Sequence, residues 1–195
     1  MCALFAALTA VFSQIMIPLP TPVPLNLALL AVWICGGALG AKRGAIAVAV
    51  YILLGAVGVP VFAGFNAGLG ALAGPTGGYI IGFLPSVIVF GLFFYNKPEP
   101  DTAEAASLAP RDRQKKDRAR FAAKYYALII AKGLAAMAVC YAPGTAWFMI
   151  TTGRGIWESL LLCVVPFIPG DILKVVAAVA VCRALRKPLR SIART

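Results

Sequence analysis

Two charged residues of opposite sign lie within an apolar segment near the end of the chain. In VPFIPGDILKVVAAVAVCRALRK, Asp171 and Lys174 are three positions apart, so they share one face of a helix. Pro169 and Gly170 indicate that the helix begins there, and Asp171 alone could be a first-turn acid stabilised by the helix dipole. Lys174 opposes that dipole, and a charge at the bilayer centre costs about 2.5–3.5 kcal/mol on insertion scales. The pair is better explained as polar anchors for a ligand.

A second candidate ligand-binding feature is the charge-free, glycine-rich segment AGFNAGLGALAGPTGGY, residues 63–79. Irregular backbone is tolerated near a membrane only where it is buried in protein or lines a cavity, and glycine permits close approach to a ligand. A flexible outer loop without a ligand is the alternative. No GK[ST] follows the glycines and no βαβ unit surrounds them, which excludes a P-loop and a dinucleotide fingerprint. The ligand-binding candidates in this segment are Asn66, Gly68, Thr76, Gly78 and Tyr79.

Other polar residues offer little chemistry. Gln14 and Asn26 lie near the outer ends of the first two apolar segments, where a helix cap or an inter-helix hydrogen bond is the favoured interpretation; Gln14 is retained as a ligand-binding candidate. The chain has no His, no paired carboxylates and no GxSxG motif, so we predict no catalytic residues. The five cysteines are isolated in the sequence, and we predict neither a metal site nor a cofactor.

The composition indicates an integral membrane protein. The chain is 61% hydrophobic and 13% charged, whereas soluble domains average about 45–50% apolar and about 25% charged residues. The net charge of +11 does not indicate nucleic-acid binding, because Lys42 and Arg43 are the only charges before residue 97 and no aromatic-studded basic face is present. We predict a single transmembrane domain over residues 1–195, embedded in the lipid bilayer.

Apolar segments of bilayer-spanning length alternate with prolines, glycines and charges. The predicted spans are residues 2–17, 25–41, 44–62, 77–95, 121–141 with an extension as far as 150, and 168–187. Fifteen of the eighteen Lys and Arg residues lie in the turn at 42–43, in a loop at 97–124 and in the tail from Arg183. Six spans place all three on one side, which the positive-inside rule assigns to the cytoplasm. The predicted fold class is an all-α integral membrane bundle of six transmembrane helices with both termini cytoplasmic.

The loops and the first helix carry further expectations. Residues 18–24, PLPTPVP, are expected to be extended, because each proline disfavours helix in the preceding residue. The second half of the 97–124 loop is expected to be helical. Small residues recur one helical turn apart in the first span, a pattern that lets another helix approach closely. They serve either internal packing or docking of a partner subunit, and they are Ala3, Ala6, Ala7 and Ala10.

The two loop motifs resemble those of a known family. GAVGVPVFAGFNAGLGALAGPTGGYIIGF and PFIPGDILK resemble the BioY family, the biotin-binding membrane subunits of energy-coupling-factor (ECF) transporters. ALFAALTAV and IPLPTPVPLNLALLAVW fit the same family's first two helices. The resemblance implies a six-helix bundle that captures biotin from outside, with the proline-rich and glycine-rich loops covering the site. It implies ligand contacts at Asp171 and Lys174 of the PGDxxK motif, at Asn66, and at Tyr79 of GPTGGY.

The resemblance also implies partners. They are a transmembrane coupling subunit and two cytoplasmic ATPases, and the alanine faces are the expected docking surface. The expected location is a bacterial plasma membrane. Whether the protein works without these partners, or as a homo-oligomer, stays open. The alternatives are the same scaffold for another vitamin, a small membrane enzyme and a purely structural subunit. An enzyme usually needs several acidic or His residues at one membrane face, and a structural subunit leaves the cost of Asp171 and Lys174 unexplained. The sequence also leaves open which end of biotin meets Lys174.

Overall fold

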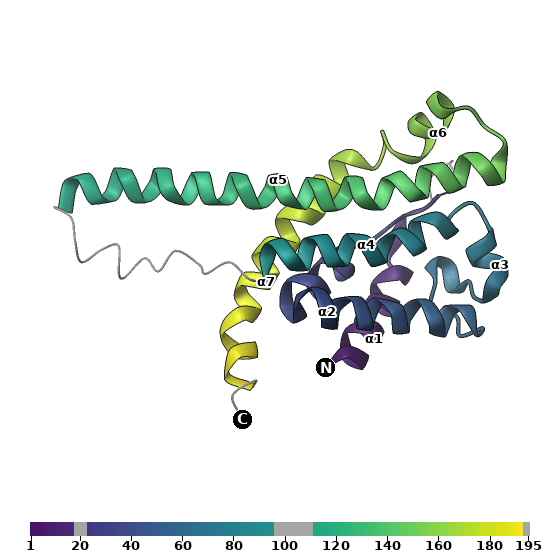
Figure 1. Ribbon diagram of the computed structural model, residues 1–195, viewed down its shortest axis with the longest axis horizontal. Helices are drawn as coiled ribbons and strands as arrows, with labels where there is room; N and C mark the ends of the chain where they lie inside the picture. Colours follow the sequence, from purple (N-terminus) through teal and green to yellow (C-terminus); the bar gives the residue numbers. More distant parts are fainter. Residues whose placement is uncertain (18–22, 96–110, 193–195) are drawn as a thin grey trace.

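The chain folds almost entirely into helices. The computed structural model describes residues 1–17, 23–95 and 111–192, with the backbone alone at 111–126, 129 and 186–192. In chain order the elements are α1 (Cys2–Gln14), β1 (Met16–Ile17), β2 (Leu25–Asn26), α2 (Ala28–Ala56), the 3-10 helix η1 (Ala63–Phe65), α3 (Gly68–Ala73), α4 (Gly77–Phe94), α5 (Arg111–Thr152), α6 (Ile156–Cys163) and α7 (Ile168–Ile192). Helices α2, α4 and α5 run along the long axis of the molecule (Figure 1), and α4 packs between the other two.

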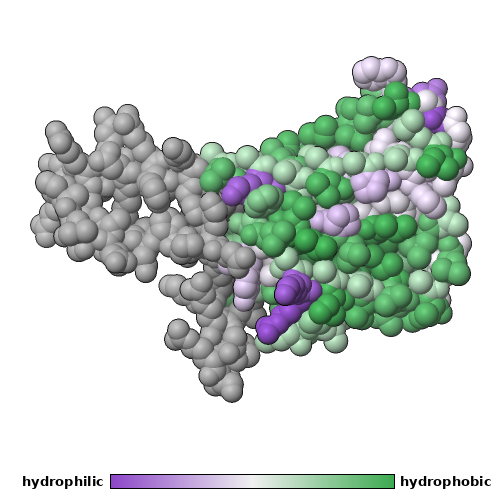
Figure 2. Space-filling view, viewed as in Figure 1, coloured by the Kyte–Doolittle hydropathy of each residue, from purple (hydrophilic) through white to green (hydrophobic). Residues whose placement is uncertain are grey.

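Several of these helices suit a membrane. Within the described residues, Ala28–Ala56, Gly77–Phe94 and Ile130–Thr152 are long and apolar enough to cross a bilayer, and α6 with α7, bent by 52°, makes a fourth candidate if the pair is one span. Figure 2 shows that hydrophobic residues dominate the visible surface between the ends of the described bundle. The predicted membrane-embedded helical class is confirmed, while this criterion finds fewer spans than the six predicted.

The long helix α2 reverses direction at Gly40. This residue has φ 81° and ψ 171°, a combination that is essentially restricted to glycine. Eight residues of a straight helix would span about 12 Å. Instead, a β-carbon added to Gly44 would lie 3.1 Å from the Cα of Gly36, and the Cys35 thiol lies 3.7 Å from the carbonyl oxygen of Gly44. Helix α2 therefore consists of two antiparallel helices, which correspond to the second and third apolar segments of the sequence.

Tight contacts hold the core of the bundle together. The Trp33 indole of α2 donates a hydrogen bond of 3.0 Å to the Ser86 hydroxyl of α4, which donates one of 2.8 Å to the carbonyl oxygen of Ala136 in α5. Gly82 allows α4 and α5 to approach closely, because a β-carbon there would lie 2.7 Å from the carbonyl oxygen of Cys140. A rigid frame of α2, α4 and α5 therefore underlies the loops at one end.

Some predicted boundaries differ from the structure. The first apolar segment was expected to remain helical to residue 17, but α1 ends at Gln14, where the chain enters the two-residue strand β1, which pairs antiparallel with β2. Helix α5 begins at Arg111 and continues past Pro143 to Thr152, so it includes the predicted helical half of the loop. The glycine-rich segment contains the short helix α3, which was not predicted. Residues 18–22 and 96–110, covering most of the proline-rich segment and the first half of the loop, lie outside the described residues.

Candidate functional site

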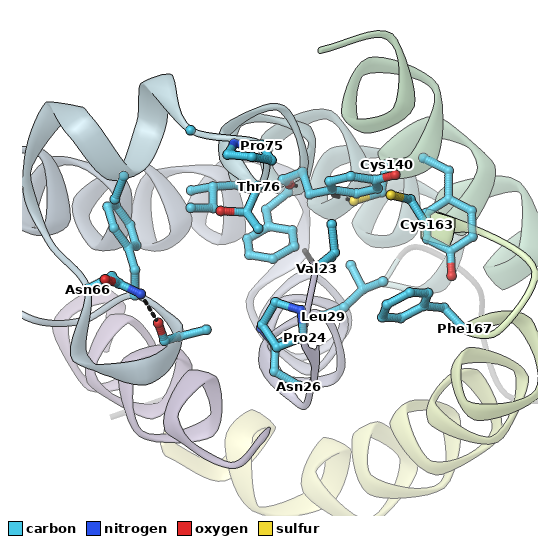
Figure 3. Close-up of a pocket in the computed structure, with 18 of the residues that line it drawn as sticks. Val23, Pro24, Asn26, Leu29, Asn66, Pro75, Thr76, Cys140, Cys163 and Phe167 are labelled. Atoms are coloured by element: carbon cyan, nitrogen blue, oxygen red, sulfur yellow. Dashed lines mark hydrogen bonds between the residues drawn. The ribbon is translucent and has the colours of Figure 1, made fainter. Parts of the chain in front are cut away.

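A cavity of about 350 Å³ lies at the end of the bundle where α3 and α6 are found (Figures 1 and 3). This volume is near the lower end of the range of about 300–1,000 Å³ typical of small-molecule sites. In the close-up view, Asn66 and Phe167 lie on opposite sides of the cavity, and Val23 and Pro24 lie between them. Aromatic rings form much of the lining: Tyr51, Phe62, Tyr79, Phe83, Tyr141 and Phe167.

The predicted charged pair lines this cavity. The side chains of Asp171 and Lys174 are only 4% and 9% exposed, and the Lys174 ammonium donates a hydrogen bond of 2.5 Å to Oδ1 of the Asp171 carboxylate. The Tyr141 hydroxyl donates a hydrogen bond to the other carboxylate oxygen, Oδ2. Both oxygens of the buried carboxylate therefore have a partner, and the carboxylate and the ammonium compensate each other's charge.

The local sequence explains how α7 presents this pair. Residues 164–167 form a turn, and α7 begins at Ile168 with a bend of 52° relative to α6. Pro169 fits the first turn of a helix, where a backbone N–H would have no intrahelical acceptor. Asp171 then falls in the first turn, where the helix dipole favours a carboxylate, and Lys174 follows on the same face. The PGDxxK segment is thus sufficient to aim both groups in one direction.

Two tyrosines from neighbouring helices form a second wall. The Tyr79 hydroxyl of α4 lies 3.2 Å from the Thr145 hydroxyl of α5, which fixes the direction of the phenol. The rings of Tyr79 and Tyr141 meet edge to face, with centroids 6.3 Å apart and an interplanar angle of 79°. Gly144 makes room for the Tyr79 ring, since a β-carbon there would clash with it. Both hydroxyls are therefore held by neighbouring residues, while the rings remain available as apolar surface.

The glycine-rich segment forms the rim. Asn66 lines the cavity, and its side-chain amide donates a hydrogen bond of 2.8 Å to the carbonyl oxygen of Ala63. At the other end of the segment, the Trp147 indole of α5 donates a hydrogen bond of 3.1 Å to the carbonyl oxygen of Gly74. Five further residues of the segment also line the cavity: Gly70, Ala71, Gly74, Pro75 and Thr76. The segment therefore lines one side of the cavity.

The structure brings together five of the eight predicted ligand-binding residues. The five that line the cavity are Asp171, Lys174, Asn66, Thr76 and Tyr79. Gly68, Gly78 and Gln14 do not belong to the described lining. Gly78 packs against α5, where a β-carbon would lie 2.8 Å from the carbonyl oxygen of Pro143. Gln14 makes hydrogen bonds to residues 61, 62 and 65, as expected for an inter-element contact. Gly78 therefore serves close packing of α4 and α5, and Gln14 attaches the loop to α1.

Sequence reasoning missed several residues of the lining. Tyr141 completes the charged group, yet nothing in its apolar segment singles it out from other aromatic residues. Cys163 and Phe167 reach the cavity only because α6 and the following turn fold back over it. Asn26 lines the cavity, and its side-chain oxygen accepts a hydrogen bond of 3.2 Å from the backbone N–H of Ala28, the first residue of α2.

The alanines of α1 divide into two groups. Ala6 is 2% exposed and belongs to the core, whereas Ala3 and Ala7 are exposed and Ala10 is intermediate. Ala7 also lines an apolar groove on the outside of α1, together with Leu4 and Leu8. The docking prediction is therefore corrected for Ala6, which serves internal packing, while the Ala3–Ala7 face is open to another helix.

The fold and the site define a class of protein. A membrane-embedded helical bundle carries a small-molecule cavity at one end, with apolar aromatic walls and a few convergent polar groups. Within the described residues, no group of three or more His, Cys, Asp or Glu side chains could hold a metal ion. These features are those of a binding protein for a compact organic molecule with polar ends and an apolar middle.

The sequence model of the BioY family matches residues 1–191, and the chain belongs to this family. It is 34% identical to the biotin transporter BioY of Thermotoga maritima over 94% of this chain and 92% of that protein. It is 33% identical to the biotin transporter BioY of Rhodobacter capsulatus, over 93% of this chain and 89% of the relative. A crystal structure of the S-component for biotin from an ECF-type ABC transporter superposes with a TM-score of 0.75 at 27% identity, covering 95% of this chain and 88% of that one. The family predicted from the loop motifs is confirmed.

Proposed function

We propose that this chain is the biotin-binding membrane subunit of an ECF-type uptake transporter, and not an enzyme. The observation that carries the proposal is the cavity of about 350 Å³ in which the Asp171–Lys174 pair and the Tyr141 hydroxyl face aromatic walls. The biotin transporters among the relatives and the biotin S-component support the same ligand. A purely structural subunit would leave a buried ion pair at the wall of a cavity unexplained.

The chemistry of the cavity suits biotin. Biotin has a ureido ring with two N–H donors and one carbonyl, an apolar thioether ring and a carboxylate on a flexible chain. Asp171 is able to accept from a ureido N–H, and Lys174 is able to attract either the carboxylate or the ureido oxygen. Asn66 offers both a donor and an acceptor at the rim, and Thr76 and Tyr79 add hydroxyls. Aromatic rings such as those of Phe83 and Phe167 suit the apolar middle. Two orientations of the ligand are compatible with these groups.

We further propose that the chain is one transmembrane domain of six spans, with both termini in the cytoplasm of a bacterial cell and the cavity facing outward. The reversal at Gly40 supports this count, because it divides α2 into two antiparallel helices. The distribution of Lys and Arg supports the orientation, since the turn at Lys42 and Arg43 lies next to the end of α4 opposite the cavity. The plasma membrane is then the expected location.

Transport requires an energy source that this chain does not encode. The S-component match supports a coupling subunit and two ATPases as partners, with the exposed Ala3–Ala7 face of α1 as the docking surface. A homo-oligomer acting without these partners is the alternative. Uptake by cells that express the chain alone, compared with cells that also express an energising module, separates the two.

A binding titration tests the function. The purified chain is titrated with biotin, desthiobiotin, riboflavin and thiamine in detergent. We expect submicromolar retention of biotin and weaker retention of desthiobiotin, which keeps the ureido ring and the carboxylate but lacks the sulfur. Retention of riboflavin or thiamine without biotin would assign the cavity to another vitamin. Retention of none of them by folded protein would exclude the proposal.

A further inference from the structure

Gln14, the last residue of α1, makes an unusual number of contacts with a distant loop. Its amide nitrogen Nε2 lies 3.2 Å from the carbonyl oxygen of Val61 and 3.0 Å from that of Phe62. Its oxygen Oε1 accepts a hydrogen bond of 2.9 Å from the backbone N–H of Phe65. The preceding residue, Ser13, donates a hydrogen bond of 2.5 Å to the carbonyl oxygen of Val61. Two adjacent side chains at the end of α1 thus satisfy several backbone groups of one loop.

The loop that Gln14 holds has a conformation that needs support. Phe65 has φ 57°, which is uncommon for a residue with a β-carbon, and the residue is 72% exposed. Such strain persists only where the surroundings over-determine the backbone. The backbone N–H of Phe62 donates to the carbonyl oxygen of Asn66 at 3.1 Å, which closes the loop on itself. The carboxamide of Gln14 therefore binds a segment of the rim that includes a residue with a β-carbon at positive φ.

This loop is also a wall of the binding cavity. Phe62, Ala63 and Asn66 line the cavity, whereas Gln14 lies outside the described lining. The hydrogen bonds between α1 and this loop run from Ser13 and Gln14 to backbone atoms of the loop. The far end of the rim is attached separately, through the Trp147 indole on α5. The backbone of the Phe62–Asn66 wall is thus hydrogen-bonded to α1, while the buried Phe62 ring packs edge to face against Tyr51 of α2.

We propose that Gln14 is a positioning residue that attaches the Phe62–Asn66 wall of the cavity to α1, so that the carboxamide controls how fast ligand escapes. The proposal rests on the proposed function for the identity of the ligand, but not for the attachment itself. Loss of the carboxamide, or a shift of α1, frees the wall and raises the dissociation rate. Because the exposed Ala3–Ala7 face belongs to the same helix, a partner that moves α1 would act on the cavity through this attachment.

The test compares Gln14→Leu with a matched control, Val11→Ala, which alters an exposed residue of the same helix. Amide hydrogen exchange of the peptide covering residues 61–66 is measured in the ligand-free protein, together with the dissociation rate of labelled biotin. We expect Gln14→Leu to raise both exchange and dissociation by about tenfold, the effect of losing one or two net hydrogen bonds. Val11→Ala should change neither, and exchange within α4 should be unaltered in both variants.

The outcomes separate this proposal from the proposed function. Wild-type exchange and dissociation rates in folded Gln14→Leu would overturn the attachment. If the wild-type protein binds no biotin but Gln14→Leu still exchanges faster at residues 61–66, the attachment is upheld and biotin is rejected as the ligand. If Gln14→Leu does not fold, Gln14→Asn gives the same readout, because its carboxamide is one methylene too short to reach the same backbone groups. A dissociation rate that rises with no change in loop exchange would indicate direct contact between Gln14 and the ligand, and would also overturn the proposal.

Discussion

Removing the two charges of the cavity one at a time, and then together, separates their structural cost from their proposed role in binding. Asp171→Asn leaves the ammonium of Lys174, whose side chain is 9% exposed, without its counter-charge. Breaking a buried pair in this way typically costs about 3–5 kcal/mol of stability. Lys174→Met is expected to cost less, because the remaining carboxylate keeps the hydrogen bond from the Tyr141 hydroxyl. Both single variants should therefore unfold at lower temperature than the wild type.

The double variant should behave differently in the two assays. Replacing a whole buried ion pair by hydrophobic residues of similar volume is often neutral, or stabilising by about 1–4 kcal/mol, and Asp171→Asn combined with Lys174→Met likewise removes both charges. The thermal midpoint should thus return to that of the wild type or exceed it. Biotin binding should stay impaired, because hydrogen bonds to charged groups are worth about 1.5–3 kcal/mol, or roughly 10- to 150-fold in Kd. Stability is then restored without function.

The assay combines thermal unfolding, followed by tryptophan fluorescence in detergent, with calorimetric titration of biotin. Wild-type affinity in the double variant would refute the reasoning, because the pair would then serve the fold alone. A double variant as unstable as Asp171→Asn would refute the desolvation argument instead. Recovery of stability with a persistent loss of affinity is the result that the geometry predicts.

Three other perturbations follow from the structure. Tyr141→Phe removes the hydroxyl that donates to Asp171 and should weaken biotin binding roughly 2- to 13-fold, measured by titration. Because one oxygen of the buried carboxylate then loses its donor, the thermal midpoint should also fall, by an amount corresponding to about 1–3 kcal/mol. Ala7→Leu should reduce coupled uptake by cells while the purified protein still binds biotin. Ala6→Leu, in the core, should instead lower the yield of folded protein. Equal loss of uptake and binding in Ala7→Leu would indicate that Ala7 serves internal packing and not docking. Gly40→Ala should lower stability by about 1–3 kcal/mol in thermal unfolding, because φ 81° strains any residue with a β-carbon, and an unchanged midpoint would contradict the reversal at this residue.

Local patterns in the sequence predicted much of this site. The spacing of Asp171 and Lys174 depends only on helix periodicity, so their shared face could be predicted without a partner. Prolines and glycines identified the loops, because their backbone restrictions and freedoms act within a few residues. The apolar composition identified the membrane-embedded class, and the loop motifs identified the family. Each of these inferences rests on interactions between near neighbours in the chain, or on the total apolar surface.

Other features depend on which helix faces reach one another. Tyr141 meets Asp171 across 30 positions, and the sequence did not predict this contact. Gln14 reaches loop groups 47 to 51 positions away, so its residue type predicted a polar contact without naming the partners. The alanine pattern of the first helix is the same on two faces, and only packing decides that Ala6 is buried and Ala7 exposed. The sequence by itself determined the class, the charged pair and the loops. Tertiary structure decided the cavity and its walls, because a cavity exists only where several helices fail to fill the space between them.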